Sequence, residues 1–166
     1  MKFPLLPDIQ ADALPDLTPE RLQARGIRAL LLDFDNTIVP YTTDVPAEPV
    51  VRWFAELERS GIAVCIVSNS RKDRVLRFCE ARALPCVRRA GKPSARGLQE
   101  AMNLLHVQPA ETAMAGDQIY TDVLAGSLAG VTTILVRPLA LSNVFLKLRH
   151  IAEKPWILAA ERRRLS

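Results

Sequence analysis

Two aspartates one residue apart indicate where chemistry could take place in this chain. Asp33 and Asp35 flank a phenylalanine directly after the apolar run ALLL. Two carboxylates this close repel each other, so either a nearby cation offsets their charge or one of them carries a proton. A charged carboxylate next to a protonated one is the arrangement required for a nucleophile with an acid beside it.

Three further polar segments follow later apolar runs. Ser68 and Asn69 follow IAVCIV, Lys92 lies in the segment GKPS, and Asp117 follows TAMAG, with Asp122 shortly after it. The aspartates offer a divalent cation only hard oxygen atoms, which favours Mg²⁺ over zinc. A carboxylate nucleophile, an acid, a cation and donors for phosphoryl oxygens are together the groups that phosphoryl transfer requires.

An alternation of apolar runs and helical patterns is expected to position these groups. The apolar runs predict strands at residues 27–34, 62–68, 85–87, 112–117 and 131–136. Apolar spacing with proline and glycine boundaries predicts helices at residues 19–25, 46–60, 71–82, 93–105 and 122–129. This alternation predicts a three-layer α/β fold with a central parallel sheet, in which the chemistry lies beyond the carboxyl ends of the strands.

Length and composition predict one soluble domain over residues 1–166, in the cytoplasm. The chain is 49% hydrophobic and 24% charged, and no apolar run approaches the roughly 20 residues that span a bilayer. The start MKFPLLPDIQ does not resemble a signal peptide, and three widely spaced cysteines indicate a reducing compartment. A net charge of +4 is too weak to indicate nucleic acid as a partner.

In this order, the segments DFDNT, SN, GKP and GDQIYTD resemble the four motifs of the haloacid dehalogenase (HAD) superfamily phosphatases. The chain is most similar to the YqeG-type group of subclass IIIA, whose relatives include mitochondrial phosphatidylglycerophosphate phosphatase. This likeness covers about residues 4 to 140 and includes LLPDI, LTPERLQARGI, GDQIYTDVLAG and VTTILVRPL. It implies a Rossmann-like HAD fold and Mg²⁺-dependent hydrolysis of a phosphate monoester.

The resemblance implies a catalytic role for the first aspartate pair. Asp33 would attack phosphorus and form an aspartyl phosphate, and it would also bind Mg²⁺. Asp35 would protonate the leaving alkoxide, later deprotonate the hydrolytic water, and bind Mg²⁺ through its backbone carbonyl. Thr37 would support the loop that shapes this pair.

The later motifs would supply the remaining groups. Ser68, with the backbone or the side chain of Asn69, would hold a phosphoryl oxygen, and Lys92 would neutralise the nucleophile and the phosphate. Asp117 would be a direct Mg²⁺ ligand, and Asp122 would bind the ion through water or support a ligand.

The spacing of the motifs leaves no room for a cap domain. Thr37 is followed within about ten residues by the helix that begins near Pro46, and only one helix and a short strand separate Asn69 from Lys92. An uncapped site admits a bulky substrate, or it borrows a neighbour's surface in a homo-oligomer.

Residues 139–166 form a predicted helical tail for which two interpretations stay open. An apolar stripe with basic flanks is typical of a helix that lies on an anionic membrane, here the inner face. A helix docked on the sheet or at a dimer contact is the alternative, and Pro155 interrupts the pattern. The residues concerned are Leu141, Val144, Phe145, Leu148, Ile151, Trp156, Ile157 and Leu158, with Lys147, Arg149, Lys154 and Arg162 to Arg164.

Several other features have simple structural interpretations. The segment from Cys65 to Arg71 fits the C-x5-R pattern of cysteine-dependent phosphatases, but it has no glycine and the cysteine lies in a predicted strand. Cys79 and Cys86 are expected to be packing residues, and His106 a surface residue. The basic residues Arg71, Lys72, Arg74 and Arg77 are expected to form a solvated helix face, although they could also attract anions.

The substrate stays open at this stage. A phospholipid headgroup such as that of phosphatidylglycerophosphate, a soluble sugar phosphate and a nucleotide would all suit the predicted chemistry. A HAD-fold binding or scaffold protein without turnover is the alternative from another functional class, and the intact set of aspartates argues against it.

Overall fold

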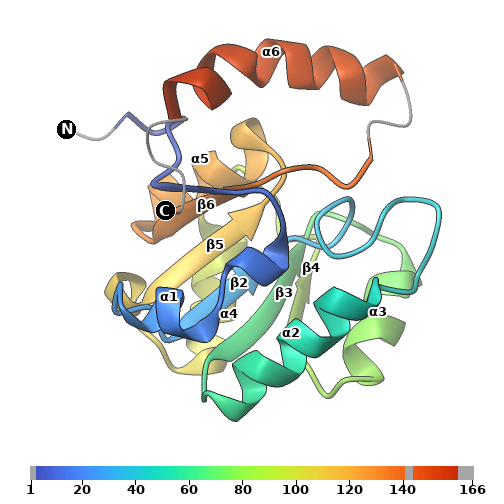
Figure 1. Ribbon diagram of the computed structural model, residues 1–166, viewed down its shortest axis with the longest axis vertical. Coiled ribbons are helices and arrows are strands. Elements are labelled where there is room, and N and C mark those ends of the chain that lie inside the picture. Colours follow the sequence, from blue (N-terminus) through green and yellow to red (C-terminus); the bar gives the residue numbers. More distant parts are fainter. Residues whose placement is uncertain (1–2, 141–143, 161–166) are drawn as a thin grey trace.

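The computed structural model describes residues 3–140 and 144–160, apart from the side chains of residues 144–146, 149 and 150. Six parallel strands form one sheet in the order β1-β6-β5-β2-β3-β4 (Figure 1). The strands are β1 (Ile9–Ala11), β2 (Ala29–Leu32), β3 (Ala63–Ser68), β4 (Cys86–Arg88), β5 (Thr112–Gly116) and β6 (Thr132–Val136). The helices are α1 (Pro19–Gln23), α2 (Glu48–Arg59), α3 (Asp73–Glu80), α4 (Arg96–Leu105), α5 (Leu124–Ala129) and α6 (Val144–Ala160).

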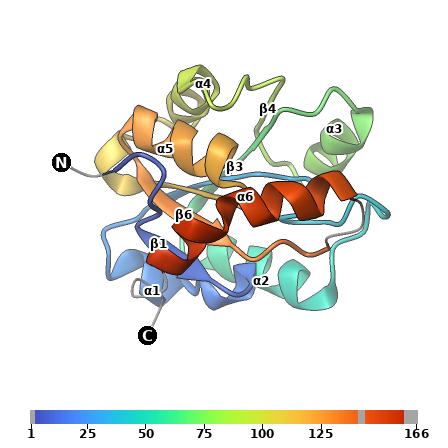
Figure 2. The same ribbon diagram turned by 90° about the horizontal axis from the view of Figure 1, so that it is seen from above.

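Helices cover both faces of the sheet, which confirms the predicted three-layer α/β fold. Side chains alternate along β2, so that Leu30 and Leu32 join the core cluster that includes residues of α1, α2 and α3, whereas Leu31 packs with residues of α4 and α5. Figure 2 shows α4 and α5 on the side opposite α1 and α2. Because both faces are covered, the strands are continuously apolar, as is typical of parallel sheets.

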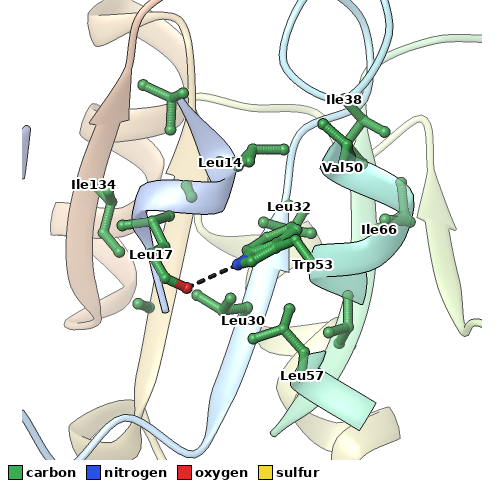
Figure 3. Close-up of a cluster of buried hydrophobic side chains, with 14 of the residues drawn as sticks. Leu14, Leu17, Leu30, Leu32, Ile38, Val50, Trp53, Leu57, Ile66 and Ile134 are labelled. Carbon is green, nitrogen blue, oxygen red and sulfur yellow. Dashed lines mark hydrogen bonds between the residues drawn. The ribbon is translucent and has the colours of Figure 1, made fainter. Parts of the chain in front are cut away.

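The larger core cluster is centred on an aromatic side chain of α2. Trp53 is 1% exposed and packs among Leu30, Leu32 and Leu57 (Figure 3). Its indole Nε1 donates a hydrogen bond of 2.8 Å to the carbonyl of Leu17, so the one polar atom of this buried ring is satisfied.

The first strand of the sheet was not among the predicted strands. Residues Ile9–Ala11 pair in parallel with β6, where Ile9 lies opposite Ile134. The strand is only three residues long and follows Pro7 closely, so its own sequence has too few positions to show a pattern. The prediction of a five-stranded sheet is therefore wrong by one edge strand.

Most predicted helices occur, with shifted ends. Thr18 caps α1 by accepting a hydrogen bond of 3.4 Å from the backbone of Arg21, as the Thr-Pro start indicates. Helix α4 begins at Arg96 rather than at Pro93, because Ser94 first closes a turn onto the carbonyl of Gly91. The helix expected from residue 122 is preceded by a π-helical turn, Ile119–Val123.

No cap domain interrupts the described part of the chain. Only a loop joins Thr37 to α2, and only α3 and β4 lie between Asn69 and Lys92. The absence of a cap agrees with the motif spacing.

Helix α6 continues through Pro155 and crosses the top of the view in Figure 1. It contacts the turn Ile119–Val123, where the Glu153 carboxylate accepts a 3.0 Å hydrogen bond from the backbone N–H of Ile119. The Trp156 ring stacks on Phe3 with centroids 4.9 Å apart. Among the described residues, no helix is long and apolar enough to cross a membrane.

Candidate active site

Four neighbouring strands bring the polar motifs to one edge of the sheet. Strands β5, β2, β3 and β4 are adjacent in this order and all parallel. Asp117 therefore follows β5 next to Asp33, which follows β2, and Ser68 ends β3 beside them. Lys92 reaches the same place from the loop after β4. The structure thus brings together Asp33 and Asp117, which the sequence placed at strand ends, and Lys92, which it placed at the start of a helix.

Lys92 is the central cation of this group, and its side chain is 1% exposed. Its Nζ lies 2.7 Å from Asp33 Oδ1 and 2.7 Å from Asp122 Oδ1, and it donates a 2.8 Å hydrogen bond to the carbonyl of Val67. Burial alone would lower the pKa of Lys92, but the charges of Asp122 and Asp33 together raise it above its ordinary value. Lys92 is therefore charged.

The backbone of Lys92 is held by the second motif. Asn69 Oδ1 accepts a 2.9 Å hydrogen bond from the Lys92 N–H, and its Nδ2 donates one of 2.9 Å to the Lys92 carbonyl. The predicted phosphate-holding amide is thus engaged in positioning the lysine. Ser68 is 1% exposed, and its hydroxyl accepts a 3.0 Å hydrogen bond from the N–H of Ser70.

Asp122 approaches the site because the end of β5 has no side chain. A Cβ on Gly116 would collide with the Asp122 carboxylate. Asp122 Oδ2 accepts a 3.1 Å hydrogen bond from the N–H of Gln118, and its buried Oδ1 pairs with Lys92 Nζ at 2.7 Å. Burial raises the pKa of Asp122 to about 6, although Lys92 acts to lower it.

Thr37 and Asn36 tie the first motif to Asp117. The Thr37 hydroxyl lies 3.3 Å from Asp33 Oδ2 and 3.4 Å from Asp117 Oδ1. Asn36 donates from Nδ2 to Asp117 Oδ2 at 3.3 Å and to the carbonyl of Ala140 at 2.9 Å, and it adopts a φ of 66°. Sequence reasoning missed Asn36, although asparagine is among the few residues that tolerate this left-handed conformation.

The acidic residues of the site fit a hard divalent cation. Oxygen atoms of Asp33, Asp117 and Asp122 all lie within 4.8 Å of one another, and all three residues are buried. One lysine cannot balance three buried carboxylates, so bringing them together is costly without a further positive charge. An oxygen-liganded cation such as Mg²⁺ would offset this charge.

Asp35 lies at the edge of this cluster, with its side chain 17% exposed. Its Oδ1 lies 3.5 Å from Arg74 Nη1. Burial raises the pKa of Asp35, the charge of Arg74 acts to lower it, and Asp33 adds to the rise. A raised pKa suits a carboxyl group that gives up a proton during a reaction.

The prediction that Arg74 belongs to a solvated helix face is wrong. Its side chain is 7% exposed and pairs with Asp35 and Asp44. Arg71, Lys72 and Arg77 are exposed, as expected for that face.

The cysteine pattern does not form a phosphate-binding loop. Cys65 lies within β3 and is 0% exposed, and burial raises its pKa to about 12. A thiol in this state is not a nucleophile at neutral pH.

Comparisons with known proteins agree with this fold and with a phosphatase. The model of the family described as haloacid dehalogenase-like hydrolase matches residues 15–130, so the chain belongs to the haloacid dehalogenase-like hydrolases. The chain is 33% identical over 159 residues to the probable phosphatase YqeG of Bacillus subtilis (strain 168), a match that covers 96% of this chain and 92% of that protein. The resemblance to the YqeG-type group is confirmed, and the chain is a phosphatase of this family.

Two more distant similarities extend the comparison. The chain is 26% identical over 147 residues to the chloroplastic phosphatidylglycerophosphate phosphatase 1 of Chlamydomonas reinhardtii, a match that covers 83% of this chain and 55% of that protein. The cobalt-bound deoxy-D-mannose-octulosonate 8-phosphate phosphatase of Haemophilus influenzae superposes with a TM-score of 0.55 at 12% identity, covering 82% of this chain and 90% of that one. At this low identity, the similarity to the Haemophilus influenzae protein shows a shared fold and nothing more.

Proposed function

We propose that the chain hydrolyses a phosphate monoester through an aspartyl phosphate on Asp33. The observation that carries this proposal is the position of Asp33 between Lys92 on one oxygen, at 2.7 Å, and the Thr37 hydroxyl on the other, at 3.3 Å. These contacts orient the carboxylate, and the positive charge of Lys92 offsets part of the negative charge that the Asp33 carboxylate and a phosphate bring together.

In the first half-reaction, an oxygen of Asp33 forms a bond to phosphorus as the bond to the ester oxygen breaks. The leaving oxygen takes a proton from the Asp35 carboxyl group and departs as an alcohol. In the second half, a water molecule gives a proton to Asp35 and attacks phosphorus, which releases inorganic phosphate and restores the Asp33 carboxylate. Lys92 and the hydroxyl of Ser68 are the groups of this chain that would stabilise charge on the phosphoryl oxygens.

Mg²⁺ is the cofactor that we propose for this site. Asp33, Asp117 and the backbone carbonyl of Asp35 would hold it, and Asp122 would support it directly or through water. Bound there, the ion would offset the negative charge of the Asp33 carboxylate and of the phosphate that it attacks.

A chromogenic aryl phosphate with and without Mg²⁺, and with EDTA, tests the reaction. The Asp33→Asn variant should lose activity by a factor on the order of 10³ or more while keeping its melting temperature, because the nucleophile is lost. Rapid acid quenching with a ³²P-labelled ester should trap label on the wild-type protein and none on the variant. An active Asp33→Asn variant, or full activity in EDTA, would contradict the mechanism.

A phospholipid headgroup is the substrate class that a second observation favours. Leu148, Ile151 and Leu158 lie on one helical face of α6 and are 60%, 62% and 52% exposed, and the exposed side chains of Lys147 and Lys154 flank them. Such a face suits contact with an anionic membrane surface, where each basic residue contributes about 1 kcal/mol. The chain would then be a cytoplasmic protein that acts at the inner face of the membrane.

The structure changes which residues of the tail enter this proposal. Trp156 is half-buried against Phe3 and so lies off the exposed face. The side chains of Val144, Phe145 and Arg149, and residues Leu141 and 162–164, lie outside the described part of the chain.

Sedimentation with phosphatidylglycerol vesicles, at low and high salt, tests the membrane contact. Binding should weaken with salt and with a Leu148→Ser/Ile151→Ser variant, and a Leu104→Ser variant, changed at an exposed leucine of α4, is the control. Absence of binding at both salt concentrations would favour a soluble sugar phosphate or nucleotide as substrate, with this face free for a second copy of the chain.

A further inference from the structure

Residues 40–44 form a loop that begins three residues after the first motif and leads toward α2. One side chain from α3 fastens it. Arg74 donates hydrogen bonds to the carbonyls of Pro40, Tyr41 and Thr43, at 3.0, 3.2 and 2.6 Å. Three backbone groups of this loop therefore depend on a single guanidinium.

The same guanidinium also contacts the carboxyl group beside the nucleophile. Arg74 Nη1 lies 3.5 Å from Asp35 Oδ1, and Arg74 Nε lies 2.9 Å from Asp44 Oδ1. The guanidinium carbon lies 5.3 Å from the centroid of the Phe34 ring, whose own edge packs on Phe78 of α3. Arg74 thus links α3 to the loop and to the neighbouring residues Phe34 and Asp35.

We infer that Arg74 is a positioning residue that orients the Asp35 carboxyl group toward the leaving oxygen and fixes the loop at the mouth of the site. The planar fork of five N–H donors is what allows one side chain to reach three carbonyls and two carboxylates, and a lysine ammonium cannot match it. The site has no cap domain, so the loop of residues 40–44, which Arg74 holds, is the nearest segment that could guide a substrate into it.

This inference rests on the proposed function, because the role it assigns to Arg74 acts through Asp35 as the acid. Leaving oxygens differ in how much they need that acid. A p-nitrophenolate leaves readily without a proton, whereas an alkoxide leaves only if it is protonated as the bond breaks. A misplaced Asp35 should therefore slow hydrolysis of an alkyl phosphate more than that of p-nitrophenyl phosphate.

The test compares kcat/KM, which reports the step in which the leaving oxygen departs, for p-nitrophenyl phosphate and for butyl phosphate in wild type, Arg74→Lys and Arg77→Gln. Arg77 is the matched control, because it lies one turn along α3, is 67% exposed, and pairs with the same Asp44 without touching Asp35 or the loop carbonyls. Since general acid catalysis contributes about 10²- to 10⁴-fold, Arg74→Lys should lose at least about tenfold more kcat/KM on butyl phosphate than on p-nitrophenyl phosphate. Arg77→Gln should keep the wild-type ratio.

A second variant keeps the inference testable if Arg74→Lys does not fold. Asp44→Ala removes the 53% exposed partner of Arg74 from the surface, and it should shift the ratio in the same direction by a smaller factor. Equal losses on both esters, or no loss, in a folded Arg74→Lys variant would overturn the positioning role. In both cases an inactive Asp33→Asn variant would show that the proposed mechanism itself still holds.

Discussion

Replacing Lys92 by methionine is expected to destabilise the fold strongly in the absence of metal. The Lys92 Nζ lies 2.7 Å from each of two buried carboxylates, those of Asp33 and Asp122. Removing one partner of a buried ion pair costs about 3–5 kcal/mol, because the other charge remains without compensation. For a chain of this length each kcal/mol shifts the melting temperature by about 2–4 °C, so a decrease of about 6–20 °C is expected.

The loss should depend on pH in a defined direction. The folded-state pKa of Asp122 is raised to about 6 from an ordinary value of 3.8, so the folded chain binds more protons than the unfolded chain between these values. Stability from this group therefore falls as the pH rises through that window. Without Lys92 the pKa of Asp122 rises further, so the deficit of Lys92→Met relative to wild type should widen from pH 5 to pH 8.

Thermal melts in EDTA at pH 5 and pH 8 check both statements, with Lys72→Met as the control because Lys72 is exposed. Adding Asp122→Asn to Lys92→Met should recover part of the loss, since one unpaired charge is then removed. Mg²⁺ should also recover part of it by binding the folded state. A decrease below about 2 °C at pH 8, or a deficit that is the same at both pH values, would refute the electrostatic reasoning.

Three further changes probe the site. Asp117→Ala should raise the Mg²⁺ requirement or abolish activity. The melting temperature of the metal-free variant should stay the same or rise, because repulsion between the carboxylates is relieved. Collapse of the fold would show that Asp117 has a structural role. Cys65→Ser should keep most activity. In the wild-type protein, Cys65 should resist iodoacetamide at pH 8, because burial raises its pKa to about 12. Rapid labelling of the folded protein would contradict the buried position of this thiol. Gly116→Ala should lower the melting temperature by several degrees, because the added Cβ would collide with Asp122 and overpacking of this kind costs about 1–3 kcal/mol of unfolding free energy. An unchanged melting curve would count against that contact.

The parts of the fold that could be predicted are those whose signals are local. A strand such as β2 is a continuous apolar run, and Asp33 follows it directly, so the place of this carboxylate in a parallel sheet follows from the strand itself. The same holds for Asp117 after β5. Lys92 could be placed near them only through the family motifs, because its loop follows the short strand β4.

The parts that could not be predicted depend on partners far along the chain. Asn36 bonds to both backbone groups of Ala140, 104 residues away. Arg74 resembles its exposed neighbours in sequence, and its charge can be buried because carbonyls 31 to 34 residues before it, and the carboxylates of Asp35 and Asp44, pair with it. Strand β1 exists because β6 offers it an edge.

The pairing of β1 with β6 has a consequence for the order of events during synthesis. Asp8 binds both the N–H and the hydroxyl of Thr133, at 2.8 and 2.9 Å, and these residues are 125 positions apart. A chain that emerges from the ribosome has no partner for residues 9–11 until residues 132–136 have followed.

The aspartates and the lysine of the site, in contrast, all lie between residues 33 and 122, in segments that are made before β6. We therefore expect the site to take shape on a partial sheet whose β5 edge is still open. Residues 9–11 should stay accessible to chaperones and proteases until β6 has been made, and they are then among the last residues of the sheet to fold.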